Sequence, residues 1–316
     1  MADGTAIEWT DATWNPVTGC SVTSPGCTNC YAMKLAGTRL RNVASRAGLT
    51  RPSKAGPVWT GEVRFNEAEL LKPLRWRRPR KIFVCAHGDL FHENVPDEWI
   101  DRVFAVMALC PQHTFQVLTK RSARMASYCD RITSATGAGA IADMMGSLGG
   151  SSGAQADFLM RQAENSCLPN VWLGVSVEDQ ARADERIPYL LDTPAAVRFL
   201  SMEPLLGAVD LANIEYHPGF FINCLTGEDV DGTWPCVHKV NWVIVGGESG
   251  RAARIMHTDW ARSLRDQCAA AGVAFFLKQL GEYAPRRGPH GMEMQRVGKK
   301  SAGRLLDNVE HSEFPE

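Results

Sequence analysis

Short apolar runs separated by amphipathic segments set the hydrophobic pattern of this chain. The runs lie at residues 82–85, 115–118, 171–175, 197–200, 242–245 and 273–277. Runs that are apolar on both faces and rich in β-branched or aromatic residues are typical of parallel strands covered by helices. Residues 97–110 and 258–271 each place apolar side chains on one helical face, the second after a Thr258 or Asp259 cap. Alternating strands and helices predict an α/β fold with a parallel sheet or partial (β/α) barrel.

Two stretches interrupt this alternation, and we interpret them as insertions near 133–168 and 208–239 in a single domain over residues 1–316. Residues 133–157 are rich in Ala, Gly and Ser, which predicts a flexible segment. The second stretch carries Cys224 and Cys236. These thiols either form a second metal pair with His217 or His238 or remain unpaired.

Composition limits the class of protein. The chain has 316 residues and a net charge of -1, which suits one large domain or two smaller ones and does not indicate a polyanion binder as a whole. No apolar run reaches membrane-spanning length, and the N-terminus does not resemble a signal peptide. We therefore expect a cytoplasmic protein without a membrane partner, in which reduced cysteines favour metal ligation over disulfides.

Three cysteines near the N-terminus carry the clearest chemical signal. Cys20, Cys27 and Cys30 lie in T-G-C-S-V-T-S-P-G-C-T-N-C-Y-A, where Gly and Pro indicate a loop. Crowded thiolates bind soft metal centres, although buried packing or a partial disulfide is the alternative. A structural zinc site needs four ligands, and the next histidine is His87. Three thiolates suit an iron–sulfur cluster with one open iron.

Basic residues are concentrated in the first quarter of the chain. Residues 72–81 read K-P-L-R-W-R-R-P-R-K, with Trp76 inside the run. Further cations lie upstream at Arg39, Arg41, Arg46, Arg51 and Lys54, and a second cluster comprises Arg296, Lys299, Lys300 and Arg304. Such a run either tracks a phosphate backbone and stacks on a base, or is a solvated segment leading into a strand.

Polar residues follow each of the six apolar runs. They include His87, Asp89 and His92, then Lys120, Ser176 and Glu178, Ser201 and Glu203, Gly246, Gly247 and Glu248, and Lys278 and Gln279. Because parallel strands present their C-terminal ends at one rim, these residues predict a polar cavity; the alternative is loop-exposed charge without a shared site. The pair Gly246 and Gly247 permits close approach of a ligand to the backbone. Rossmann, P-loop and H-E-x-x-H motifs are absent.

A cysteine loop before a helix, followed by strand–helix repeats with polar ends, resembles the radical S-adenosylmethionine (SAM) superfamily. The segments I-E-W-T-D-A-T-W-N-P-V-T-G-C, S-P-G-C-T-N-C-Y-A, W-V-I-V-G-G-E-S-G and G-K-K-S-A-G-R-L-L-D resemble, over nearly the whole chain, a phage- and prophage-associated family of uncharacterised three-cysteine proteins. Most radical SAM enzymes have C-x3-C-x2-C, whereas this chain has C-x6-C-x2-C with Tyr31 after the last cysteine.

The superfamily resemblance implies a radical SAM type of partial barrel and specific roles for these residues. Cys20, Cys27 and Cys30 would hold a [4Fe–4S] cluster that reductively cleaves SAM to a 5′-deoxyadenosyl radical. By strand order, SAM binding would fall to His87, Gly88, Asp89, Ser176, Glu178, Gly246 and Gly247, and catalysis to Lys120, Glu203 and Glu248. The implied partners are a flavodoxin- or ferredoxin-type electron donor and a nucleic-acid or nucleotide substrate.

Two alternative functions remain open at this point. A zinc-stabilised nucleic-acid-binding protein would recruit a distant fourth ligand such as His87 or His257. An iron–sulfur redox or electron-transfer protein would carry the cluster without SAM chemistry. The six polar strand ends favour an enzyme, of lyase, isomerase or transferase type, over a sensor.

Overall fold

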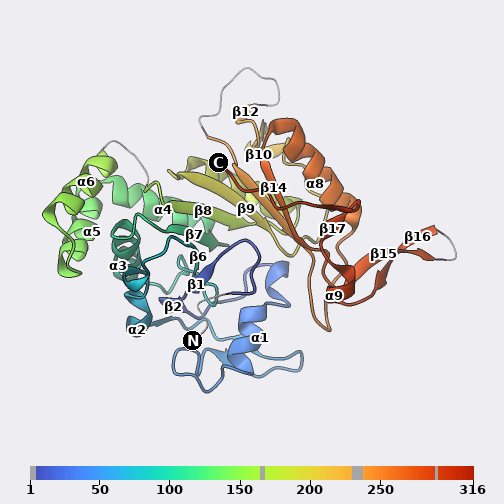
Figure 1. Cartoon of the computed structure of the whole chain (residues 1–316), viewed down its shortest axis with the longest axis horizontal. Coiled ribbons are helices and arrows are strands. Elements are labelled where there is room, and N and C mark those ends of the chain that lie inside the picture. The colour runs from blue at the N-terminus through green and yellow to red at the C-terminus, as the bar shows by residue number, and fades with distance from the viewer. Residues whose placement is uncertain (1–4, 164–167, 230–237, 289–290) are drawn as a thin grey trace. The chain divides into compact units, whose positions relative to one another are not determined.

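A seven-stranded sheet organises the chain, with the strand order β1-β6-β7-β8-β9-β13-β14 (Figure 1). The computed structural model describes residues 5–163, 168–229, 238–288 and 291–316. The sheet comprises β1 (Ala12–Trp14), β6 (Lys81–Val84), β7 (Thr114–Thr119), β8 (Val171–Ser176), β9 (Val197–Met202), β13 (Trp242–Gly246) and β14 (Ala274–Gln279). β1 pairs with β6, β6 with β7, β9 with β13 and β13 with β14, all in parallel. The predicted α/β class is confirmed, and the sheet is consistent with a partial (β/α) barrel.

The six predicted strands all exist, at β6, β7, β8, β9, β13 and β14. Every residue of β9 and β13 is buried, which explains why these runs are apolar without alternation. β1 was not predicted, because three residues are too short to show a period.

The helices are α1 (Tyr31–Gly37), α2 (Glu67–Leu70), α3 (Asp97–Ala108), α4 (Ser122–Thr133), α5 (Ala135–Ser147), α6 (Ser152–Ala163), α7 (Gln180–Asp192), α8 (Thr258–Ala271) and α9 (Lys299–Ala302). α3 and α8 confirm the two predicted helices. The predicted Thr258 or Asp259 cap is wrong, since His257 occupies the N-cap without a side-chain hydrogen bond. Within the described ranges, no helix has the length and apolar character needed to cross a bilayer.

The chain divides into two compact units. Unit 1 comprises residues 1–174 and 193–196, and unit 2 comprises residues 175–192 and 197–316. In unit 1, small two-stranded ladders join β2 (Val17–Thr18) to β5 (Arg64–Phe65) and β3 (Thr50–Arg51) to β4 (Val58–Trp59). In unit 2, hairpins join β15 (Tyr283–Gly288) to β16 (Gly291–Arg296) and β17 (Leu305–Leu306) to β18 (Val309–Glu310). The predicted single domain stays a prediction.

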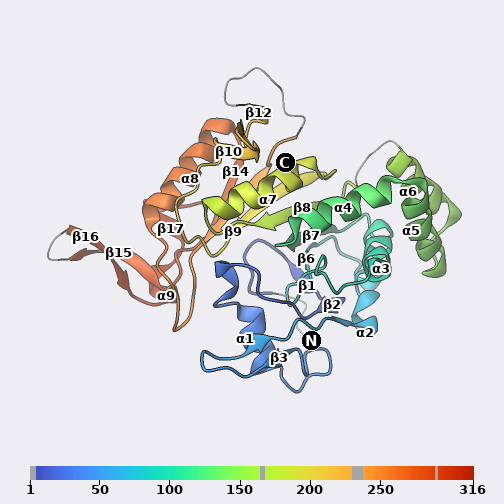
Figure 2. The same ribbon diagram turned by 180° about the vertical axis from the view of Figure 1, so that it is seen from behind.

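The first insertion is helical, which corrects the predicted flexible segment. α5 and α6 pack against each other in unit 1, as both ribbon views show (Figure 2). Ser134 caps α5 by accepting a hydrogen bond from the Gly137 amide at 3.1 Å. Alanine favours a helix, and this preference prevails over the glycines once the apolar face, including Ile141, is buried. Residues 164–167 lie outside the described ranges.

The second insertion contains a three-stranded antiparallel sheet of β10 (Ile214–His217), β11 (Phe220–Asn223) and β12 (Glu228–Asp229). Cys224 is fully buried, and burial together with the charge of Cys268 raises the pKa of its thiol. A thiol held protonated in this way is suited to packing rather than metal binding. Cys236, its predicted partner, lies outside the described residues.

Candidate functional site

The cysteine loop of unit 1 is fixed to the segment that follows β6. The Gly19 amide donates to the His87 carbonyl at 3.1 Å, and Gly19 forms a parallel bridge with Gly88. A Cβ on Gly19, whose φ is +95°, would lie 2.2 Å from the Glu62 carbonyl oxygen. A Cβ on Gly88 would lie 3.0 Å from the Val17 carbonyl oxygen. Gly88, predicted to bind a cofactor, therefore permits the cysteine loop to approach β6 closely.

The three predicted ligands lie on one loop of unit 1. Cys27 is buried at the end of a 3-10 turn (Pro25–Cys27), and Cys30 directly precedes α1. Cys30 interacts electrostatically with both Cys20 and Cys27. Cys20 and Cys30 are half-buried, and each of the three cysteines is a free thiol. One loop thus gathers three thiols with no disulfide between them.

The three thiols differ in how easily they ionise. Burial raises the pKa of Cys20 to about 12 and also raises the pKa of Cys30. Burial acts in the same direction on Cys27, but the Lys120 charge and hydrogen bonds from residues 23 and 24 bring its pKa below the usual value. The Thr23 and Ser24 hydroxyls lie 3.8 Å and 3.9 Å from the Cys27 sulfur. Cys27 is therefore the thiol best stabilised as a thiolate.

Arg121 connects the cysteine loop to the sheet. One guanidinium nitrogen, Nη1, lies 3.3 Å from the Cys20 sulfur and 3.2 Å from Asp89 Oδ2, and Nη2 donates to the Ser21 hydroxyl at 2.7 Å. Nε donates to Glu93 at 3.3 Å. The side chain is only 6% exposed. Sequence reasoning chose the neighbouring Lys120 and missed this residue, although both follow the same predicted strand.

Asp89 is fully engaged in holding the ends of β6 and β7. Its Oδ1 accepts from the Thr119 hydroxyl at 2.7 Å and from the Phe91 amide at 3.0 Å. Its Oδ2 accepts from the Lys120 amide at 3.1 Å, in addition to Arg121. Four donors on one buried carboxylate make Asp89 a positioning residue in this structure.

His87 is a neutral imidazole of defined tautomer. Arg46 Nη2 lies 3.1 Å from its Nδ1, and because arginine only donates, the ring proton resides on Nε2. Burial, and then the Arg46 charge, lower the pKa of His87 to about 4. The Tyr31 ring meets the imidazole edge-on, and the Tyr31 hydroxyl donates to the Ala86 carbonyl at 2.7 Å.

His92 and Ser21 resemble a nucleophile–base pair, but the hydrogen bond between them runs in the wrong direction for base catalysis. The Asn94 amide donates to His92 Nδ1 at 3.1 Å, which leaves the proton on Nε2. Nε2 therefore donates to the Ser21 hydroxyl at 3.0 Å and does not act as its base.

Unit 2 brings together a second group of predicted residues. Pairing of β13 with β9 and β14 places Glu203 beside Gly246 and Lys278. Glu203 Oε2 lies 2.8 Å from Lys278 Nζ, and Glu203 Oε1 accepts from Gln279 at 3.1 Å. The ion pair is partly buried, with side chains 15% and 21% exposed. A Cβ on Gly247 would lie 2.2 Å from the Leu280 carbonyl oxygen, so this glycine is required for close packing of backbone segments.

The other predicted acids of unit 2 are held by arginines. Glu248 accepts from the Arg254 amide at 2.8 Å and from its guanidinium Nε at 3.0 Å. Glu178 is fully buried and accepts from Arg186 at 3.0 Å. The same guanidinium donates to the Ser176 carbonyl at 2.8 Å. These pairs satisfy buried charge, and Glu203 is the most exposed of the three carboxylates, at 21%.

The basic run around Trp76 combines an anchored ring with exposed cations. Arg80 lies 4.9 Å from the Trp76 ring centroid, and the ring meets His113 edge-on at 6.1 Å. Arg75, Arg77 and Arg78 are exposed. The half-buried indole serves as an anchor in this structure and not as an open stacking face.

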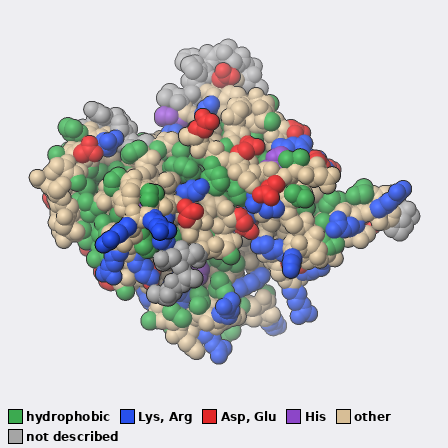
Figure 3. All heavy atoms as spheres, in the orientation of Figure 1, with side chains coloured by type: hydrophobic (Ala, Val, Ile, Leu, Met, Phe, Trp, Pro, Cys, Tyr) green, Lys and Arg blue, Asp and Glu red, His purple; other side chains and the backbone are tan. Residues whose placement is uncertain are grey.

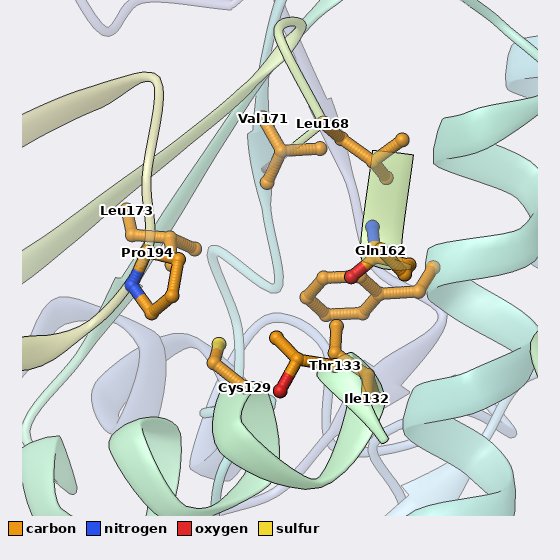
Figure 4. Close-up of a pocket in the computed structure, with 9 residues that line it drawn as sticks. Cys129, Ile132, Thr133, Gln162, Leu168, Val171, Leu173 and Pro194 are labelled. Carbon is orange, nitrogen blue, oxygen red and sulfur yellow. The ribbon is translucent and has the colours of Figure 1, made fainter. Parts of the chain in front are cut away.

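Two further observations concern possible ligand sites. Over the residues that the structure describes, no three His, Cys, Asp or Glu side chains lie where they could hold one metal ion. A small pocket of unit 1 is lined mainly by apolar side chains, including Ile132, Leu168, Val171 and Leu173 (Figure 4). None of the predicted site residues lines this pocket.

A family model described as "Protein of unknown function (DUF5131)" matches residues 4–315. No curated protein and no solved structure matches the chain.

Proposed function

Because the chain belongs to the DUF5131 family, whose description names no activity, we propose a function from its own residues: a radical SAM-type iron–sulfur enzyme. The observation that carries the proposal is the gathering of Cys20, Cys27 and Cys30 on one loop of unit 1. Three thiolates would suit a [4Fe–4S] cluster that keeps one iron open to a cofactor. The ligands of such a cluster lie farther apart than the ligands of a single metal ion.

The surroundings of the thiols fit an anionic metal centre. Arg121 donates to the Cys20 sulfur, and the Lys120 charge acts on Cys27 and Cys30. Two cations and two hydroxyls thus compensate the charge that three thiolates would bring into a half-buried loop. Among buried thiols of unit 1, Cys110 has none of these partners, and burial raises its pKa to about 12.

The chain's residues then have distinct roles. Cys20, Cys27 and Cys30 would bind the cluster, which when loaded supplies the electron for reductive cleavage of SAM. Arg121 orients Cys20, and Asp89 holds Arg121 against the end of β7. The expected roles in catalysis, for Lys120, Glu203 and Glu248, stay predictions, as do the phage association and the electron donor. The expected roles in SAM binding also stay predictions, for His87, Gly88, Asp89, Ser176, Glu178, Gly246 and Gly247.

Anaerobic reconstitution tests the proposal. Wild-type protein and Cys27→Ala are compared with Cys129→Ala, a control that removes a buried thiol of the same unit outside the loop. We expect about four irons per chain for the wild type and the control, and loss of iron and sulfide for Cys27→Ala. The low-temperature EPR signal of the reduced wild type should change when SAM is added, with release of 5′-deoxyadenosine.

Other outcomes assign the chain elsewhere. Zinc without iron would support a zinc-stabilised binding protein. A cluster whose EPR signal is unchanged by SAM would support a redox or electron-transfer protein. A cluster retained in Cys27→Ala would overturn the ligand assignment.

A further inference from the structure

We propose that a cation-rich module at residues 34–60 binds the phosphate backbone of single-stranded nucleic acid, which makes nucleic acid the substrate class of the adjoining cysteine site. The assignment as substrate rests on the proposed function, whereas binding by the module does not. The module comprises the end of α1, the β3–β4 ladder and the loops between them.

The module and the cysteines share one hydrophobic cluster. Its buried members are Ala32, Met33, Ala36, Leu49 and Trp59, and Cys20, Cys30 and Val58 pack against them. Two bonds fix the loop before β3, since the Thr18 hydroxyl donates to the Ser45 carbonyl at 2.6 Å and Arg64 donates to the Ala44 carbonyl at 2.5 Å. The cationic surface is therefore built on the same core as two of the three thiols.

Charge within the module has one sign. Residues 34–60 contain six Lys or Arg residues and no Asp or Glu. Arg39, Arg41, Arg51 and Lys54 are exposed, and in the described chain none has a side-chain hydrogen bond or ion pair. Figure 3 shows Lys and Arg side chains over the part of the view that contains α1. Cations held apart on a fixed segment that has no carboxylate of its own suit a repeating polyanion.

The neighbouring side chains favour nucleic acid over a membrane. Val43 is the one large aliphatic residue of the module described as strongly exposed, at 45%, so there is little apolar surface to insert into lipid. Three of the four exposed cations are arginines, whose planar guanidinium matches phosphate oxygens. Tyr31, which directly follows Cys30, is 49% exposed with its hydroxyl fixed on Ala86. An unpaired base can stack on such a held ring, which favours single strands.

Fluorescence anisotropy with labelled oligothymidylate and oligouridylate tests the proposal. The test variant is Arg39→Gln/Arg41→Gln/Arg51→Gln/Lys54→Gln. The control removes the same charge from exposed cations of unit 2, as Arg286→Gln/Arg287→Gln/Lys299→Gln/Lys300→Gln. We expect the test variant to lose affinity tenfold or more, as an order of magnitude, and to lower the slope of log K against log salt by about 3. The control should bind like the wild type.

Several outcomes would overturn the proposal: no binding of either oligonucleotide by the wild type at low salt, equal losses in both variants, or binding of phosphatidylserine vesicles in place of oligonucleotides. Preference for one oligonucleotide would identify DNA or RNA as the source of the phosphate backbone. Circular dichroism checks that both variants remain folded. The two proposals can fail separately. If the wild-type cluster responds to SAM but the protein does not bind oligonucleotides, only this inference is wrong. If the wild type binds oligonucleotides but holds no cluster, only the proposed function is wrong, and Cys27→Ala should still bind oligonucleotides.

Discussion

Arg121 donates a hydrogen bond to the sulfur of Cys20 at 3.3 Å, although 101 residues of chain separate them. The same nitrogen reaches Asp89 at 3.2 Å. One guanidinium therefore sets the position of a cysteine on an irregular loop by reference to the end of the sheet. This contact connects the chemistry of the loop to the packing of unit 1.

Replacing Arg121 with Ala should lower the free energy of unfolding by about 3 kcal/mol, because it leaves the buried Asp89 carboxylate without its ion-pair partner. Urea denaturation of the metal-free protein measures this. Arg102→Ala removes a pair with the exposed Glu67 and should cost about 1 kcal/mol or less. Similar losses for the two variants would contradict the buried role of Arg121.

Replacing Gly247 with Ala should destabilise the protein by about 2 kcal/mol, because the added methyl group meets the Leu280 carbonyl oxygen and forces the backbone apart. Gly139 lies in α5 and a Cβ there meets nothing within 4 Å. Gly139→Ala should therefore stabilise by about 0.5–1 kcal/mol through helix propensity. Thermal unfolding distinguishes the two variants, because Gly247→Ala should lower the melting temperature and Gly139→Ala should raise it. If Gly247→Ala leaves stability unchanged, the two backbone segments do not approach so closely in solution.

Replacing Lys278 with Met should lower the free energy of unfolding by about 1–2 kcal/mol, because Glu203 loses its ion-pair partner in a partly buried setting. Arg161→Met removes an exposed ion pair with Asp157 and should cost about 0.5 kcal/mol or less. The two losses are compared by urea denaturation at neutral pH. Added salt should reduce the effect of the Arg161 variant more than that of the Lys278 variant, since buried pairs are screened less.

Stability should fall with decreasing pH between about 6.5 and 4, partly through His87. Its folded-state pKa is about 4, below the unfolded value, so between these values the unfolded chain binds the extra proton. The stabilisation is complete above the unfolded pKa and is lost as pH falls through the folded pKa. Denaturant titrations at several pH values over this range should show that the free energy of unfolding depends less steeply on pH in His87→Gln than in the wild type. An unchanged pH dependence of the free energy of unfolding in His87→Gln would contradict this assignment to His87.

The candidate site was partly predictable. Cys20, Cys27 and Cys30 stand out because spacing and loop residues are local properties of the sequence, whereas their role as ligands stays a prediction. The role of Arg121 could not be predicted, because nothing local distinguishes it from Lys120. The packing role of Gly88 could not be predicted either, since the carbonyl groups opposite it belong to residues far away in the chain, and its role in SAM binding stays a prediction.

By itself, the sequence determined six of the seven strands of the main sheet, the parallel α/β class and the cysteine loop. Burial on both faces and turn chemistry leave local patterns that are visible without knowledge of a partner segment. Membership of an uncharacterised family over nearly the whole chain was also evident from sequence segments. The tertiary structure decided which partner each strand-end carboxylate has and how exposed it remains. Asp89, Glu178 and Glu248 are buried and each is held by an arginine, whereas the Glu203 carboxylate pairs with Lys278 and stays 21% exposed. A buried charge takes whichever partner the fold brings within hydrogen-bond reach, and that choice depends on contacts between distant segments.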